Sequence, residues 1–241
     1  MPLDVRVISH QKFEEFKNPW DDRNGFTKAF RTLVQQESGL KGRVLDIGCG
    51  KGISNEAMTD FPSWCAHLDG IDPTAEVMEH PALENRWQGE FETAPIPEQT
   101  YDLAIAFNVV EHIKNSRSFI DRVAAILKPG GVFWALTPHA DHPFCWISRG
   151  VELVGLKNFA ADKHKGINRY STYYRLNSIG GVRKLAEHAG FARADFYRFP
   201  CVNWDSYFPQ YLHWAPHLYD HLLGCRVPAF MQIIVYRLQK A

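Results

Sequence analysis

The residues best suited to chemistry are a cluster of glycines behind an acidic residue, Asp46-Ile-Gly48-Cys-Gly50-Lys-Gly52. Glycine lets the backbone turn tightly and approach a ligand without a Cβ in the way. A dinucleotide fingerprint, G-x-G-x-x-G, needs its third glycine at the position of Ile53. The spacing therefore favours a nucleotide-like ligand without a pyrophosphate, and Asp46 can face a cationic amino-acid tail on that ligand.

A second acidic residue supports the same ligand class. Asp72, in Gly70-Ile71-Asp72-Pro73, closes the next predicted strand. A carboxylate at that place can accept hydrogen bonds from both ribose hydroxyls of a bound adenosine. The competing interpretation is a glycine-rich turn beside an ordinary surface carboxylate.

Short apolar segments alternate with helical ones along the chain, which is the pattern of a sheet covered by helices on both faces. The predicted strands are Arg43–Ile47, Cys65–Ile71, Asn85–Gln88, Asp102–Phe107, Val132–Leu136, Ala192–Phe199 and Ala229–Arg237. The predicted helices are Ile53–Thr59, Ile113–Leu127 and Ile179–Ala189. We therefore expect an α/β fold with a Rossmann-like, seven-stranded, mostly parallel sheet whose last strand is antiparallel.

Two aromatic-rich stretches interrupt the alternation, one after the fifth strand and one before the last. We predict that residues 139–177 and 203–223 form lid-like insertions around an acceptor pocket, since long loops in compact domains usually carry function. Residues 1–40 are expected to form an N-terminal cap. The 241 residues suit one domain that spans residues 1–241.

Four segments in this order resemble the successive motifs of class I S-adenosylmethionine-dependent methyltransferases: VLDIGCGKG, GIDP, GEFETAPIPEQTYDLAIAFNVVEHI and LKPGGVFWALTPH. Within the class, the chain is similar to the ubiquinone-pathway O-methyltransferases and their small-molecule relatives. NVVEHI and the upstream PWDDRNGFTKAFRTL carry that likeness. The insertion has DKHKGINRYSTYY where those enzymes carry a G-T-H-D-W-like segment, so their polyprenyl-benzenoid acceptor is not predicted here.

The resemblance implies S-adenosyl-L-methionine as cofactor, S-adenosyl-L-homocysteine as product, and ten cofactor-binding residues. These are Asp46, Gly48, Cys49 and Gly50 at the methionine part, Asp72 and Pro73 at the ribose, Glu90 and Phe91 at the adenine, and Phe107 and Asn108 at the sulfonium. In sheets of this kind the ligand lies at the carboxyl ends of the strands, where all ten positions fall.

The expected reaction is methyl transfer to a small-molecule acceptor, with a hydroxyl preferred. Such an acceptor needs a base near neutral pH, and the candidates are His139, His112, His164 and Glu111. Each has a structural alternative, because Glu111 could cap the following helix and the histidines could pack or be solvated.

N- or C-methylation, and cyclisation or cleavage of the cofactor's aminocarboxypropyl chain, stay open. Ile53 disfavours a nicotinamide oxidoreductase, and the intact motifs disfavour a non-catalytic binding protein.

Composition limits the partners. Lys plus Arg equals Asp plus Glu at 27 each, so no global field attracts nucleic acid. The apolar stretches are too short to span a membrane, and the five cysteines lack CxxC spacing, which favours the cytoplasm. A homodimer stays open.

His213, His217 and His221 lie four residues apart, but Pro216 interrupts their helix, so no metal site is predicted.

Overall fold

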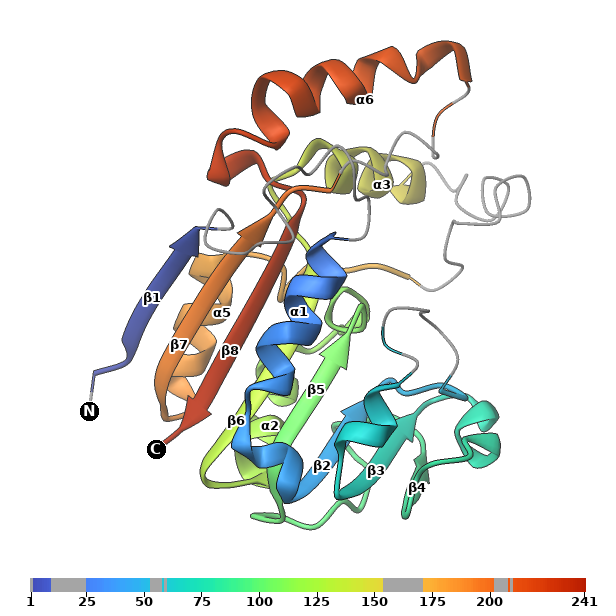
Figure 1. The fold of residues 1–241 in the computed structure, drawn as a ribbon, viewed down its shortest axis with the longest axis vertical. Coiled ribbons are helices and arrows are strands. Elements are labelled where there is room, and N and C mark those ends of the chain that lie inside the picture. The colour runs from blue at the N-terminus through green and yellow to red at the C-terminus, as the bar shows by residue number, and fades with distance from the viewer. Residues whose placement is uncertain are drawn as a thin grey trace.

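A single eight-stranded sheet forms the centre of the molecule (Figure 1). The computed structural model describes residues 2–9, 25–52, 58, 60–153, 171–201, 208 and 210–241. Its strands are β1 (Asp4–Ser9), β2 (Arg43–Ile47), β3 (His67–Asp72), β4 (Arg86–Gln88), β5 (Tyr101–Phe107), β6 (Leu127–Pro138), β7 (Phe191–Phe199) and β8 (Ile233–Lys240). They lie in the order β1-β7-β8-β6-β5-β2-β3-β4.

The seven predicted strands are all present, and the last is antiparallel as expected. β8 lies between β6 and β7 and runs antiparallel to both, while the other pairs are parallel. The eighth strand, β1, comes from the stretch expected as a cap and pairs with β7. Its sequence, DVRVIS, is six residues long and alternates polar and apolar residues only over its first four positions. An edge strand with one neighbour needs little burial, so its sequence signal is weak.

Helices cover both faces of the sheet, as predicted. α2 (Ser116–Ile126) and α5 (Ile179–His188) pack on one face, and α1 (Gly25–Gln35) packs on the other (Figure 1). α2 begins three residues later than expected, because the Asn115 side chain caps it by accepting a hydrogen bond from the Ser118 N–H. A short 3-10 turn, η7 (Val110–His112), fills the gap after β5.

Further helices lie in the connections. α3 (Pro143–Leu153) follows β6, and α6 (Trp214–Tyr219) continues into a π-helical turn, η10 (Asp220–Gly224). The remaining short helices are η3 (Ser38–Lys41), η5 (Phe61–Trp64), η6 (Ala75–Glu79), η9 (Gln210–Leu212) and η11 (Pro228–Phe230). The predicted helix Ile53–Thr59 falls almost wholly outside the described residues. Within the described part, no helix has the length and apolar character that crossing a bilayer requires.

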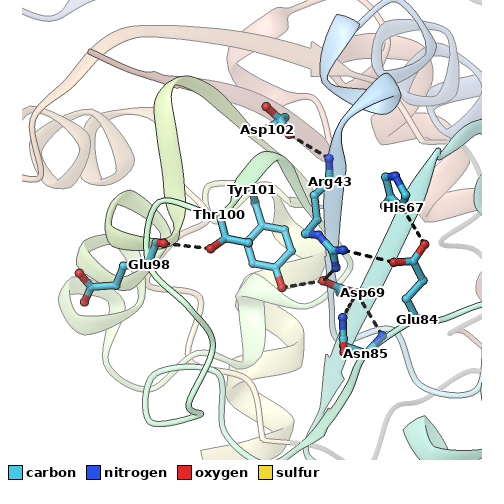
Figure 2. Close-up of polar contacts among 9 residues, drawn as sticks. All are labelled: Arg43, His67, Asp69, Glu84, Asn85, Glu98, Thr100, Tyr101 and Asp102. Carbon is cyan, nitrogen blue, oxygen red and sulfur yellow. Dashed lines mark hydrogen bonds and ion pairs between the residues drawn. The ribbon is translucent and has the colours of Figure 1, made fainter.

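A buried ion pair joins the strands near their amino ends (Figure 2). Asp69 of β3 is 1% exposed and accepts hydrogen bonds from Arg43 of β2 at 2.7 Å and from the Tyr101 hydroxyl of β5 at 2.9 Å. The backbone and side-chain N–H groups of Asn85 satisfy its other oxygen. A buried carboxylate needs such partners. The network fixes this end of three strands and leaves their carboxyl ends for a ligand.

Candidate active site

A cavity of about 240 Å³ opens at the carboxyl ends of β2, β3, β4 and β5. The chain segments that follow these strands line it, together with two residues of the segment that returns toward α5. The lining residues are Ile47, Gly48, Ile71, Pro73, Gly89, Glu90, Phe91, Glu92, Val109, His112, Ile113, Ser171 and Tyr173. Parallel strands end at one edge, which explains why positions spread over 127 residues of sequence meet.

The cavity brings together five of the residues expected from the sequence: Gly48, Pro73, Glu90, Phe91 and His112. The remaining described residues of that set do not line it: Asp46, Cys49, Gly50, Asp72, Phe107, Asn108, Glu111 and His139. His164 lies outside the described residues. Sequence reasoning did not include Val109 or Ser171, because an aliphatic residue and a lone serine carry no chemical signal.

The glycines of the loop after β2 differ in the reason for their presence. Gly48, Gly50 and Gly52 all have positive φ, at 75°, 51° and 81°. A Cβ on Gly48 would meet Val109 at 2.3 Å, and one on Gly52 would meet His80 at 2.4 Å, so both are required by packing. A Cβ on Gly50 would meet no atom of the described residues within 4 Å. Of the three glycines, Gly50 alone has space beside it in this part of the chain, as the cradle of a ligand would.

Asp72 holds this loop in place. Its Oδ2 accepts the Gly50 N–H at 2.9 Å, and its Oδ1 accepts the Thr74 N–H at 2.8 Å and the Thr74 hydroxyl at 2.7 Å. The side chain is 9% exposed. An ionised carboxylate offers about four acceptor positions, so Oδ2 retains room for one further donor. The carboxylate therefore has a structural role that sequence reasoning did not include, beside the expected contact with the ribose.

Asp46 has no hydrogen-bond donor among the described residues. Burial, and then the charge of Asp72, raises the pKa of the Asp46 carboxyl to about 7. A nearby cation would favour the ionised form and lower this pKa. An unmatched carboxylate beside the open space at Gly50 fits the ammonium group of the methionine part of S-adenosylmethionine.

Two aromatic residues expected at the cofactor turn out to face opposite sides of the sheet. Phe91 lines the cavity, is 4% exposed and packs against Phe119 with ring centroids 5.1 Å apart. Phe107 packs against Phe30 of α1 at 5.5 Å and does not reach the cavity. Phe107 is the last residue of β5, and the left-handed backbone at Asn108 turns the chain after it, so that Val109 lines the cavity.

Asn108 sits where β5 ends, in the left-handed backbone region with φ 54°. Its N–H donates to the carbonyl of Leu136 at 2.9 Å. Asparagine tolerates this conformation better than most residues. Asn108 therefore redirects the chain from β5 into η7 and points the following residues at the cavity.

Glu111 is a buried carboxyl that joins three segments. It is 6% exposed and accepts a hydrogen bond from the Thr137 hydroxyl at 2.9 Å, while the Asn177 amide donates to the same hydroxyl at 2.7 Å. Its backbone carbonyl accepts the N–H groups of Tyr173 at 2.7 Å and Tyr174 at 3.2 Å. Burial raises the pKa of Glu111 to about 7. The side chain positions the segment 171–177, and Thr137 and Asn177 are functional candidates that sequence spacing does not reveal.

Of the base candidates in the described part of the chain, His112 alone lines the cavity. Its Nδ1 lies 2.8 Å from the Ser171 carbonyl oxygen, so that nitrogen donates and the neutral ring carries its lone pair on Nε2. His139 is 1% exposed, its Nδ1 lies 3.1 Å from the Met231 carbonyl oxygen, and burial lowers its pKa. His139 therefore packs inside the protein and does not face the pocket.

The described residues contain no group of three or more His, Cys, Asp or Glu side chains arranged to hold a metal ion. His213 precedes α6, and its Nε2 lies 2.9 Å from the Phe208 carbonyl oxygen. Pro216 stands in the first turn of α6, where the missing N–H is tolerated. α6 starts at Trp214 and runs through Pro216 without a break, so the interruption expected between His213 and His217 is not found.

Comparisons with known proteins concern the family and the fold of the chain. Residues 20–195 match the profile of a family described as methyltransferase domain. A ubiquinone biosynthesis O-methyltransferase of Paraburkholderia xenovorans (strain LB400) is 27% identical over 241 aligned residues, covering 90% of this chain and 95% of that protein. The solved structure of an S-adenosylmethionine-dependent methyltransferase from Mesorhizobium loti shares the fold, with a TM-score of 0.57 at 14% identity, covering 91% of this chain and 98% of the other.

A further solved structure is that of the Haemonchus contortus phosphoethanolamine N-methyltransferase 2 in complex with S-adenosyl-L-methionine. It matches with a TM-score of 0.58 at 14% identity, covering 94% of this chain and 55% of that one. At such identities the likeness concerns the fold.

Proposed function

This chain belongs to the methyltransferase-domain family and is an S-adenosylmethionine-dependent methyltransferase, and we propose that it methylates a hydroxyl group of a small-molecule acceptor. The observation that carries the proposal is the position of His112, whose imidazole lines the cavity with Nε2 as its basic nitrogen. The curated relative named as an O-methyltransferase supports the same acceptor class.

The cofactor supplies an electrophilic methyl group, so the protein has to align the acceptor and remove its proton. Asp46 would bind the ammonium group, the open side of Gly50 would admit the methionine part, and Asp72 would accept from the ribose. Phe91 and Glu90 would contact the adenine. Glu90 and Phe91 line the cavity, and Asp72 holds the Gly50 N–H, which supports these roles.

His112 would take the proton of the acceptor hydroxyl. A neutral imidazole suits this step because its ordinary pKa lies near physiological pH. Ser171 holds the ring by accepting from Nδ1, and Glu111 in turn holds the segment that carries Ser171 and Tyr173. The insertions at 139–177 and 203–223 would select the acceptor. All five cysteines are free thiols, which supports action in a reducing compartment such as the cytoplasm.

The decisive experiment uses cofactor with a deuterated methyl group and acceptors offered as matched pairs, each hydroxyl compound beside its amine analogue. We expect S-adenosylhomocysteine as co-product and the label on oxygen, detected by mass spectrometry. Label on nitrogen or carbon would contradict O-methylation. Methylthioadenosine as co-product would instead show reaction at the aminocarboxypropyl chain.

The role of His112 is tested by His112→Gln. Loss of a general base typically costs about 10²–10⁴-fold in turnover, and the rise of the rate with pH should disappear with it. Ser171→Ala is the matched control, because it keeps the carbonyl that holds His112. An unchanged pH profile in His112→Gln would move the base to another residue.

A further inference from the structure

The segment that returns toward α5 has a strained backbone at Tyr174. This residue has a positive φ of 51° and is 6% exposed. A bulky residue rarely adopts the left-handed conformation, and backbone strain of this kind collects at sites where function requires it. Neighbouring groups therefore have to hold the segment in a conformation that it does not prefer.

Contacts on two sides hold Tyr174. Its N–H donates to the carbonyl of Glu111 at 3.2 Å, and its hydroxyl donates to the Ser148 Oγ at 3.1 Å. The Arg149 guanidinium of α3 lies over the Tyr174 ring, 5.0 Å from the centroid. The N–H of the adjacent Tyr173 donates to the same Glu111 carbonyl at 2.7 Å. Tyr174 is thus anchored both to η7 and to α3, which fixes the direction of the residues on either side of it.

This arrangement brings Arg175 to the rim of the cavity. Tyr173 lines the cavity, and the Arg175 guanidinium lies over its ring, with Cζ 5.9 Å from the centroid. Nη1 of Arg175 donates to the carbonyl of Lys114 at 2.7 Å. Lys114 directly follows Ile113, which also lines the cavity. Two segments that border the cavity therefore hold the guanidinium in place.

The charge of Arg175, an exposed residue, has no partner in the part of the chain that the structure describes. No carboxylate there lies within ion-pair distance of it, and the one hydrogen bond that it forms there uses Nη1. Nε and Nη2, which share an edge of the planar guanidinium, remain available. Two parallel N–H groups of this kind match two oxygens of a carboxylate or a phosphate. Arg175 therefore presents an anion-binding edge beside the cavity.

The same short segment carries the contact that orients the proposed base. The Ser171 carbonyl oxygen lies 2.8 Å from Nδ1 of His112, which leaves Nε2 as the basic nitrogen. Ser171 and Arg175 are four residues apart, a stretch that even a fully extended chain spans in at most about 14 Å. A single small molecule can therefore place a hydroxyl at His112 and another group at Arg175.

We propose that Arg175 determines acceptor specificity by binding an anionic group, a carboxylate or a phosphate, of the molecule whose hydroxyl is methylated. This rests on the proposed function and narrows the acceptor to a small anionic hydroxy compound. Two carboxylates, Glu90 and Glu92, line the cavity after β4, and β2 and β3 lie between β4 and β5 in the sheet. Because these carboxylates repel an anion, its favoured place is on the side of η7, beside Arg175.

Calorimetric titration into enzyme loaded with S-adenosylhomocysteine tests the proposal, and binding does not depend on which atom is methylated. The aromatic probes are 3-hydroxybenzoate, 3-hydroxyphenyl phosphate and neutral methyl 3-hydroxybenzoate. The aliphatic probes are glycolate, 2-hydroxyethyl phosphate and neutral methyl glycolate. In at least one of the two sets, we expect an anionic probe to bind about tenfold or more tightly than the ester, because the ester cannot accept charge-assisted hydrogen bonds from the guanidinium. The tighter of the two anions identifies carboxylate or phosphate.

Arg175→Gln should abolish the preference for the anionic probe and leave the affinity for the neutral ester unchanged. Arg175→Lys keeps the charge without the planar edge and should retain part of the preference. The matched control is Arg183→Gln, which removes an exposed arginine of α5 that does not line the cavity. This control should bind every probe as the unaltered protein does. Circular dichroism and affinity for S-adenosylhomocysteine should stay the same in all three variants.

Equal affinity for anionic and neutral probes in both sets, or an equal loss in Arg183→Gln and Arg175→Gln, would overturn the proposal. Weaker binding of S-adenosylhomocysteine by Arg175→Gln alone would also overturn it, by assigning Arg175 to the carboxylate of the cofactor. The methyl-label experiment tests the proposed function separately. Label on nitrogen would contradict O-methylation and would leave the preference for anions in the binding experiment intact.

Discussion

The glycines after β2 look alike in sequence and separate by what a side chain would meet. Gly48 and Gly52 face Val109 and His80, so substituting them disturbs packing before it disturbs a ligand. Gly50 faces open space, at a φ of 51° that costs an L-residue about 1 kcal/mol or more. It is therefore the position at which ligand space and protein packing can be tested separately.

We predict that Gly50→Ala lowers affinity for S-adenosylhomocysteine by about tenfold or more, because the new methyl group enters the space of the ligand. Gly130→Ala is the matched control, since Gly130 also has positive φ (76°) and nothing within 4 Å of its Cβ. Both variants should lose similar thermal stability, and only Gly50→Ala should lose affinity in calorimetric titration. Equal affinity in the two variants would show that the loop does not hold the cofactor.

At the level of elements, the site depends on how η7, the end of β6 and the segment 171–177 are held together. Glu111 contacts all three through the Thr137 hydroxyl and the Tyr173 and Tyr174 N–H groups. The native state binds protons at Glu111 up to a pKa of about 7, well above the ordinary value. Where the native state binds more protons than the unfolded state, the free energy of unfolding falls as pH rises.

We predict that the buried Glu111 carboxyl lowers the free energy of unfolding as the pH rises from 5 to 7, and that Glu111→Gln removes this contribution. The group contributes at most about 1.4 kcal/mol per pH unit. Glutamine keeps an acceptor for Thr137 and carries no charge to bury, so the variant should lose less stability over this range than the unaltered protein. Asp46, whose pKa is raised, and the buried histidines, whose pKa values are lowered, contribute equally in both proteins. Urea denaturation at pH 5, 6 and 7 measures how the free energy of unfolding depends on pH. Asp46→Asn should remove the contribution of Asp46 to that dependence. A slope unaffected by Glu111→Gln would show that this carboxyl is ionised throughout.

On the scale of the whole molecule, the sheet has two different edges. β2, β3 and β4 form one side of the sheet, and the cavity opens at their carboxyl ends. On the opposite side, β1 is the edge strand and pairs with β7 from Asp4 to Ser9. An unpaired edge strand exposes backbone donors and acceptors to other chains. β1 covers the nine-residue β7 and is itself a six-residue edge that carries Asp4 and Arg6, and short charged edges resist pairing with other chains.

We predict that deleting residues 1–9 lowers thermal stability and causes concentration-dependent aggregation, because β7 becomes an open edge. Affinity for S-adenosylhomocysteine should stay within about twofold, since β1 does not touch the cavity. Deleting residues 1–3 keeps the strand and should have neither effect. Light scattering and calorimetric titration measure the two properties, and a large loss of cofactor affinity would contradict the separation of the edges.

The sequence by itself determined the features that depend on local order. Glycine spacing after a strand excluded a dinucleotide and indicated the cofactor class, because backbone approach depends on the residues at those positions. The alternation of apolar segments predicted seven strands, and their carboxyl ends were expected to share one edge. Five predicted residues do line one cavity there: Gly48, Pro73, Glu90, Phe91 and His112.

Only the tertiary structure decided which face each side chain takes and which distant segments meet. Phe107 was expected at the cofactor and packs on Phe30 of α1, and the turn at Asn108 brings Val109 to the cavity. Thr137 reaches Glu111 across 26 positions, and Asn177 reaches Thr137 across 40. His139, the leading base candidate by sequence, is buried at 1% exposure. These outcomes follow from long-range packing, in which burial is settled by neighbours that no local pattern names.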